Sequence, residues 1–194
     1  MTKSRLEAFS DGVIAIIITI MVLELKVPHG SDLTALQPLL PVALSYLLSF
    51  VFLGIYWNNH HHMFQAVKQV NGGILWANLH LLFWLSLIPA VTHWLGENYT
   101  APWPVAAYGV VLLAAGFAYY ILAHALVAHH GPGSPLHVAL GRDFKGKISL
   151  VIYAVAIATA FYATRVACAL YIVVAIMWLV PDPRIERTLA HSEQ

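Results

Sequence analysis

Asp11 is the first residue whose type and position suggest chemistry, because it lies near the start of a long apolar segment. A charged side chain inside a membrane is costly and is expected to face protein or water rather than lipid. Polar candidates for its partners occur near the ends of two later apolar segments, as His60, Asn78 and His80. Because histidine changes charge near neutral pH, such a cluster could bind helices together or carry protons.

The composition indicates that these residues belong to a membrane protein. Of the 194 residues, 60% are hydrophobic and 10% are charged, and the mean hydropathy is +0.73. Soluble domains contain about 45–50% apolar and about 25% charged residues. A formal net charge of +1 provides no basic face for nucleic acid. The single cysteine, Cys168, excludes a disulfide framework or a cysteine metal site within one chain.

Apolar segments of the chain are long enough to cross a bilayer core of about 30 Å. They are separated by connectors rich in glycine, proline or asparagine. The expected segments are 9–27, 38–57, 74–95, 104–128, 147–163 and 166–181. A tight hairpin at Thr164 and Arg165 should join the last two. The sequence therefore predicts an all-α integral membrane bundle of six helices, forming one domain over residues 1–194.

The basic residues predict how this bundle is oriented. The chain has ten lysines and arginines, and with six spans all of them except Lys26 and Arg165 fall on one side of the membrane. By the positive-inside rule, the N- and C-termini are then cytoplasmic.

No enzyme motif is found in the chain. It contains no Gly-x-Ser-x-Gly, no His-Glu-x-x-His and no phosphate-binding glycine loop. We therefore predict that the protein is not an enzyme and uses no cofactor or metal. A small secondary transporter would need charges or a broken helix near the midplane, where Pro89 is the candidate break.

The first expected helix carries an apolar stripe on one face and the carboxylate of Asp11 on another. At about 100° per residue and with Ile16 taken as the origin, Leu23 lies at about −20°, Ile20 at about +40° and Thr19 at about −60°. These residues form a stripe of apolar bulk with one hydroxyl. Asp11 lies at about −140°, so the carboxylate and the stripe cannot face the same environment.

Groups at the depth of Asp11 come from the ends of neighbouring helices. We interpret the cluster first as interhelical hydrogen bonding and, as an alternative, as a proton relay or pH sensor. The histidine that meets Asp11 is left open among His60, His61, His80 and His124.

Several other polar residues are expected at the membrane interfaces. Glu24 is expected to be solvated and paired with Lys26, while His129 and His130 should end the fourth helix in solvent. Tryptophans near the expected boundaries, including Trp178, are typical of an aromatic belt.

The pattern Arg-x-x-x-Phe-Ser-Asp, present as Arg5, Phe9, Ser10 and Asp11, continues into Gly-Val-Ile-Ala-Ile-Ile-Ile-Thr and ends in Leu-Glu-Leu. It resembles the signature of the bacterial relatives of transmembrane protein 175, the endolysosomal potassium channel. The resemblance covers roughly the first half of the chain, and the last three helices match only as hydrophobic spans. It extends to Trp57-x-x-His60, Phe64, Asn78-Leu79 and Ile88-Pro89.

This resemblance implies a homotetramer in which the first helix of each copy lines a central pore. By position, Ile16 would be the apolar constriction, Thr19 a hydroxyl layer and Leu23 a second apolar ring, with Ile20 on the same stripe. The family also implies a buried polar network that holds this helix in place. The residues expected in or beside that network are Arg5, Phe9, Ser10, Asp11, Trp57, His60, Asn78 and His80.

We therefore predict a potassium-selective cation channel in the inner (plasma) membrane, with potassium as the permeant ion. No Thr-Val-Gly-Tyr-Gly filter is present. Selection would come from a narrow apolar ring that admits a partly dehydrated ion, and potassium sheds water more easily than sodium. A proton-conducting leak pathway through Asp11 and the histidines, or a small secondary transporter, are the alternatives.

Overall fold

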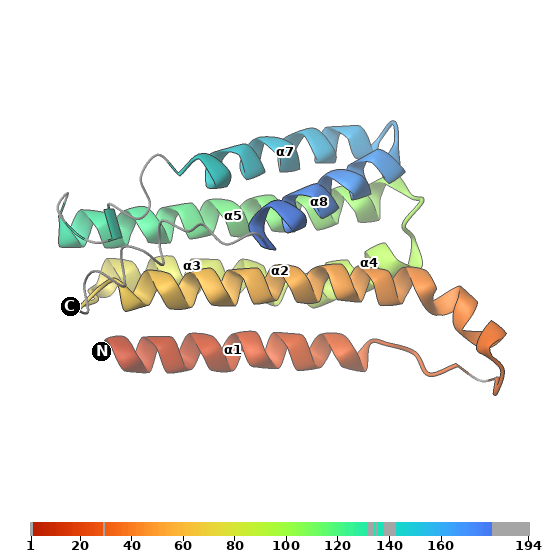
Figure 1. The fold of residues 1–194 in the computed structure, drawn as a ribbon, viewed down its shortest axis with the longest axis horizontal. Coiled ribbons are helices and arrows are strands. Elements are labelled where there is room, and N and C mark those ends of the chain that lie inside the picture. Colours follow the sequence, from red (N-terminus) through yellow and green to blue (C-terminus); the bar gives the residue numbers. More distant parts are fainter. Residues whose placement is uncertain (1, 29, 132–133, 135, 138–142, 180–194) are drawn as a thin grey trace.

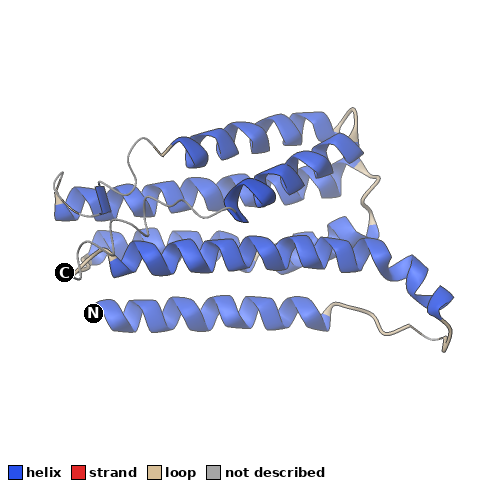
Figure 2. Ribbon diagram, viewed as in Figure 1, coloured by secondary structure: helices blue, strands red, loops and turns tan. Residues whose placement is uncertain are grey.

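The computed structural model describes residues 2–28, 30–131, 134, 136–137 and 143–179. Within these residues the chain is helical and contains no strand (Figure 2). The elements are α1 (Lys3–Leu23), the 3-10 helix η1 (Leu33–Leu39), α2 (Leu40–Gln65), α3 (Gly72–Ser86), α4 (Ile88–Glu97), α5 (Pro102–His130), α7 (Phe144–Ala160) and α8 (Thr164–Leu179).

The long helices lie roughly side by side, with α1 at one edge of the bundle (Figure 1). α1 packs against α2, α3 and α4, and α5 packs against α3, α4 and α7. α8 contacts α7, α5 and α2. The start of α1, the end of α2, the start of α3 and the end of α5 share one end of the molecule (Figure 1). This is the end that the charge pattern predicts to be cytoplasmic.

The length and hydropathy of the helices identify a multi-pass membrane protein. Four helical segments are long and apolar enough to cross a bilayer: Lys3–Leu23, Leu33–Gln65, Gly72–Glu97 and Pro102–His130. α8 is also apolar but shorter. That six segments cross the membrane stays a prediction, and the expected end at residue 181 lies outside the described residues, as do Arg142, Arg184 and Arg187.

The third expected segment is broken into α3 and α4 at Leu87. Pro89 causes this break, because proline lacks an N–H and its ring clashes with the carbonyl four residues earlier, at Leu85, in a continuous helix. α4 then begins at Ile88 with the proline in its first turn, a position that tolerates it.

Several helix ends differ from the sequence-based boundaries, among them the start of α1, which lies at Lys3 rather than at residue 9. α1 ends at Leu23 rather than at residue 27, and α2 continues to Gln65 rather than ending at residue 57. The turn of the last hairpin lies at 161–163, so Thr164 and Arg165 begin α8 instead of forming the turn. No glycine or proline marks that turn, so the sequence offered only the polar pair as a boundary.

α5 and α8 approach each other closely at Gly109. The hydroxyl of Tyr171 donates a hydrogen bond to the Val105 carbonyl at 3.0 Å. A Cβ atom at Gly109 would lie only 2.1 Å from that hydroxyl oxygen. The missing side chain of Gly109 therefore makes room for this contact between the helices.

Candidate pore-lining helix

α1 has a packed face and an unpartnered face. The packed face carries residues spaced three or four apart, as a helix periodicity of 3.6 requires. These buried residues are Leu6, Ser10, Ile14, Ile17 and Met21.

The opposite face of α1 carries the apolar stripe that the sequence predicts. In a single copy of the chain, Ile16 is 58% exposed, Ile20 44% and Leu23 81%, and Thr19 is also exposed. A row of large apolar side chains at the edge of a bundle has no partner within its own chain. It therefore faces lipid, another copy, or a pore formed between copies.

Thr19 is the one hydroxyl on this stripe, and its hydrogen is already engaged. Thr19 Oγ1 donates to the carbonyl oxygen of Ile16 at 2.8 Å. The lone pairs of the hydroxyl oxygen consequently remain available to a cation or to water on the exposed side of α1.

A buried chain of hydrogen bonds holds the packed face of α1. Ser10 Oγ donates to the Leu6 carbonyl at 2.9 Å and accepts from Asn78 Nδ2 at 2.9 Å. Asn78 Oδ1 lies 2.8 Å from His60 Nε2. Because an amide oxygen can only accept, His60 carries its hydrogen on Nε2 and donates it. Ser10, Asn78 and His60 are each at most 2% exposed, and the chain joins α1, α3 and α2.

Other residues expected in the polar network lie apart from this chain. Asp11 accepts a hydrogen bond from Trp57 Nε1 at 3.0 Å, and both residues are exposed, so its partner is a tryptophan rather than a histidine. His80 accepts from Trp84 Nε1 at 2.9 Å, one turn along its own helix.

Arg5 and Phe9 also lie outside the buried chain of hydrogen bonds. Both side chains are exposed, Phe9 to 50%. Neither takes part in a hydrogen bond or ion pair within the described residues. His124, another candidate partner of Asp11, bonds the Tyr120 carbonyl of its own helix at 2.9 Å.

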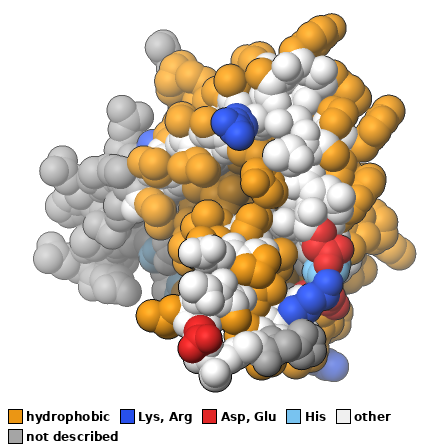
Figure 3. All heavy atoms as spheres, turned by 90° about the vertical axis from the view of Figure 1, so that its right-hand side faces the viewer, with side chains coloured by type: hydrophobic (Ala, Val, Ile, Leu, Met, Phe, Trp, Pro, Cys, Tyr) orange, Lys and Arg blue, Asp and Glu red, His pale blue; other side chains and the backbone are white. Residues whose placement is uncertain are grey.

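Acidic, basic and histidine side chains gather at the opposite end of the molecule, where most of the surface is uncharged (Figure 3). Lys26 forms an ion pair with Glu97. His93 Nδ1 lies 3.7 Å from Glu24 Oε2, and its Nε2 lies 3.6 Å from Glu97 Oε2. The predicted pairing of Glu24 with Lys26 is therefore wrong. α1 ends at Leu23, and the chain beyond it carries Lys26 to the end of α4.

Sequence reasoning did not single out His93 and Glu97. Their spacing of four residues, which puts both side chains on one face of α4, was the available signal.

The two histidines that end α5 also differ from expectation. His130 is half-buried, and both His129 and His130 hydrogen-bond to the connector between α2 and α3. The prediction that they are solvated holds for His129, which is exposed, and is wrong for His130. The sequence could not reveal these bonds, because the connector and the end of α5 are about sixty residues apart.

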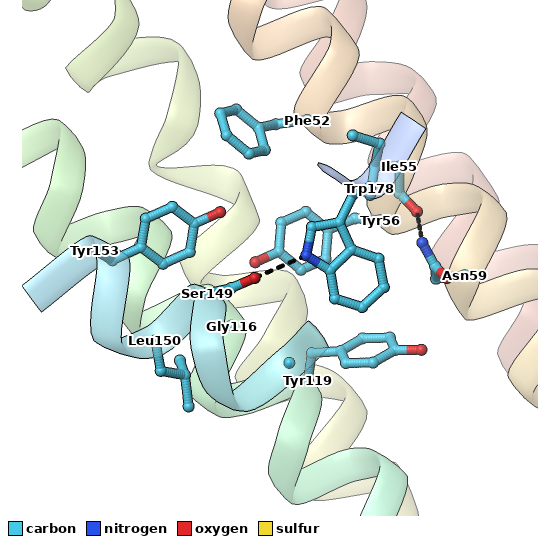
Figure 4. Close-up of a pocket in the computed structure, with 11 residues that line it drawn as sticks. Phe52, Ile55, Tyr56, Asn59, Gly116, Tyr119, Ser149, Leu150, Tyr153 and Trp178 are labelled. Carbon is cyan, nitrogen blue, oxygen red and sulfur yellow. Dashed lines mark hydrogen bonds between the residues drawn. The ribbon is translucent and has the colours of Figure 1, made fainter. Parts of the chain in front are cut away.

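A cavity of about 40 Å³ lies between α2, α5, α7 and α8, enough for a few water molecules. Aromatic side chains such as Tyr56 and Tyr153 form much of its wall (Figure 4). Trp178 turns into it and donates to Ser149 Oγ at 2.8 Å, rather than standing only in an aromatic belt. No residue of α1 lines this cavity, so it is separate from the exposed stripe.

Comparison with known proteins relates the whole chain to ion channels. Residues 5–89 match the family described as endosomal/lysosomal potassium channel TMEM175. A potassium channel of Chryseobacterium sp. (strain P1-3) is 57% identical over 192 residues, which is 99% of this chain and 100% of that protein. The human endosomal/lysosomal proton channel TMEM175 is 37% identical over 81 residues, covering 36% of this chain and 16% of that protein.

A solved structure extends the likeness to the later helices. It is the crystal structure of a lysosomal potassium-selective channel TMEM175 homologue from Chamaesiphon minutus. The two structures superimpose with a TM-score of 0.80 at 29% identity, over 92% of this chain and 96% of that chain. These relatives are named as channels and none as an enzyme. The fold and the relative that matches this chain over 99% of its length lead to one conclusion: the chain belongs to the TMEM175 family of ion channels.

Proposed function

We propose that this chain is the subunit of a potassium-selective cation channel whose pore is lined by α1 from four copies. The observation that carries the proposal is the exposed stripe of Ile16, Thr19, Ile20 and Leu23 at the edge of a single subunit. The names of the Chryseobacterium relative and of the Chamaesiphon structure support potassium as the permeant ion.

A single copy cannot enclose a pore with this stripe, because α1 lies at the edge of the bundle (Figure 1). Copies arranged around an axis would bring their stripes together. In such a homotetramer Ile16 forms the narrow apolar ring, Leu23 forms a second ring, and Thr19 supplies hydroxyl oxygens between them.

Selection in this pore follows from the cost of removing water. A narrow apolar ring offers no oxygen atoms in place of the hydration shell, so the ion that sheds water more easily passes more readily. Potassium is that ion in comparison with sodium. The Thr19 oxygens, whose lone pairs remain free, replace part of the lost water one turn from Ile16.

The buried hydrogen-bond chain from Ser10 through Asn78 to His60 has the role of positioning α1. An ion-sized constriction requires that the pore helix keep a fixed rotation and height relative to α2 and α3. We further propose that the channel lies in the plasma membrane with both termini in the cytoplasm, as the distribution of basic residues favours.

The names of the vertebrate relatives favour a second candidate function, proton conduction. A proton pathway would use the ionisable side chains near α1, with the apolar rings stopping larger ions. The two candidates differ in which ion carries the current.

Planar bilayers containing the purified protein test the proposal, with potassium on one side, sodium on the other and equal pH on both. We expect a reversal potential displaced toward the potassium equilibrium potential. Ile16→Asn should move it toward zero, because a polar side chain admits hydrated sodium. Val22→Asn is the matched control: Val22 is 46% exposed on the same helix but lies off the stripe, and the variant should keep the wild-type reversal potential.

A second substitution tests the hydroxyl layer. Thr19→Val keeps the shape of the side chain but removes the oxygen, and should reduce the preference for potassium, whereas Thr19→Ser should retain it. A reversal potential that follows only an imposed pH gradient would replace this proposal with proton conduction. If Ile16→Asn and Val22→Asn change the reversal potential equally, Ile16 does not form the constriction.

A further inference from the structure

His130 joins the end of α5 to the connector between α2 and α3. Its Nε2 accepts the backbone N–H groups of Lys68 and Gln69, at 3.3 and 3.4 Å. Its Nδ1 lies 2.9 Å from the Leu126 carbonyl oxygen. Because a backbone N–H can only donate and a carbonyl can only accept, this ring must be neutral, with its hydrogen on Nδ1.

His129 contacts the same connector through Asn71, and the same reasoning applies to its ring. Asn71 Oδ1 accepts the N–H of Ile74 at 2.9 Å, so the amide oxygen is assigned and Nδ2 is the donor. That Nδ2 lies 3.2 Å from His129 Nδ1. His129 Nδ1 must therefore accept, and this ring is also neutral, with its hydrogen on Nε2.

We infer that His129 and His130 form a pH-sensitive latch that releases the connector 66–71 from α5 when this side of the membrane is acidified. A proton added to either ring turns the accepting nitrogen into a donor that faces another donor. Protonation of His130 removes the hydrogen bonds to Lys68 and Gln69, and protonation of His129 removes the bond to Asn71. Imidazole groups in general take up a proton between about pH 5 and 8.

The connector carries a charge of the same sign as a protonated ring of the latch. The connector carries Lys68 and no acidic residue, and the first turn of α3 has no ionisable side chain. The two rings, on neighbouring residues of α5, are 5.1 Å apart. His137, beyond α5, is exposed. At the start of α7, Asp143 interacts with His124 and Lys147.

The latch stands at the start of the helix that positions α1. Asn71 is the N-cap of α3, and Asn78, two turns further along α3, donates to Ser10 of α1. Release of the connector therefore loosens the beginning of the same helix that anchors the stripe-bearing helix. This inference concerns the fold and holds whether or not the chain conducts potassium.

Hydrogen exchange of the full chain in detergent tests the latch, at about pH 7.5 and about pH 5.5 with correction for the intrinsic exchange rates. In the wild type we expect the amides of Lys68 and Gln69 to lose protection by about tenfold at the lower pH. Amides in the turn at 161–163 serve as an internal reference and should not change.

Two variants assign the effect to the latch. His130→Gln places an amide oxygen near the position of Nε2, accepts both N–H groups and does not titrate, so the connector should stay protected at both pH values. His137→Gln, an exposed histidine at the same end, should behave as the wild type does. If His130→Gln does not fold, His129→Asn provides the equivalent test at Asn71. Unchanged protection in the wild type, or equal loss in the wild type and His130→Gln, would overturn the inference.

Discussion

Asn78 donates its amide N–H to Ser10 Oγ at 2.9 Å, and this bond determines that His60 Nε2, on the other side of the same amide, carries a hydrogen. With Nδ2 directed at Ser10, the amide oxygen faces His60 and must accept from it. One side chain therefore satisfies polar groups from two other helices in a region where water is excluded.

Asn78→Ala should destabilise the protein because it leaves Ser10 and His60 without their partner. We expect a loss of about 1–3 kcal/mol in the free energy of unfolding. The measurement is denaturant or thermal unfolding in detergent. Asn98→Ala is the matched control, since Asn98 is exposed and bonds only a carbonyl of its own helix.

A double-mutant cycle with Ser10→Ala isolates the contact between Ser10 and Asn78. If the two substitutions cause additive losses, Asn78 does not act through Ser10. Coupling of about 0.6 to 2 kcal/mol is the result expected for a polar contact between membrane helices.

Gly109→Ala should disrupt the contact between α5 and α8. The added Cβ atom would lie 2.1 Å from the Tyr171 hydroxyl and 2.8 Å from Ile157 Cγ1, so the helices must shift or Tyr171 must lose its bond to Val105. Overpacking of this kind costs about 1–3 kcal/mol. The thermal unfolding temperature should fall accordingly.

Two further variants test this explanation of Gly109. Gly54→Ala is the control, because nothing lies within 4 Å of its added Cβ and alanine favours the helix. Adding Tyr171→Phe to Gly109→Ala should recover part of the loss by removing the hydroxyl. Similar unfolding temperatures for Gly109→Ala and Gly54→Ala would contradict it.

Asp143→Asn should stabilise the protein at neutral pH. Burial raises the pKa of the Asp143 carboxyl, against the smaller effects of the Gly146 N–H, His124 and Lys147. The folded state therefore binds a proton more readily than the unfolded state, and stability is lost as the pH rises through the folded pKa. Asparagine keeps the cap to Gly146 and tolerates the left-handed backbone at this position, where φ is 40°.

Thermal unfolding of Asp143→Asn at a series of pH values tests whether the carboxyl destabilises the folded state at neutral pH. The variant should unfold at a higher temperature than the wild type near pH 7, and the difference should vanish below about pH 4, where the carboxyl is protonated in both states. Asp32→Asn is the control, because Asp32 is exposed and makes no side-chain cap bond. If the difference in unfolding temperature between the variant and the wild type grows as the pH falls, the pKa of Asp143 is not raised in the folded state.

The helical fold and the two faces of α1 could be predicted from the sequence by itself. Runs of apolar residues determine which segments can lie in a bilayer, and a period of 3.6 residues puts Ile16, Thr19 and Leu23 on one face with Ser10 turned away. These are properties of neighbours along the chain. The break at Pro89 is also predictable from the sequence, because it depends only on the proline and its neighbours along the chain.

Only the tertiary structure decided which distant side chains meet. The sequence contains His60 and Asn78, but the bond between them depends on how α2 and α3 pack. Asp11 was expected to meet a histidine and instead accepts from Trp57, because the packing of α1 against α2 brings that tryptophan beside it.

The contacts of His130 and of Lys26 follow the same principle. Each joins segments about sixty or seventy residues apart. Hydrogen bonds and ion pairs act over a few ångströms, so their partners are chosen by the positions of whole helices. Periodicity along one helix determines which face a residue occupies, and packing between helices determines what that face touches.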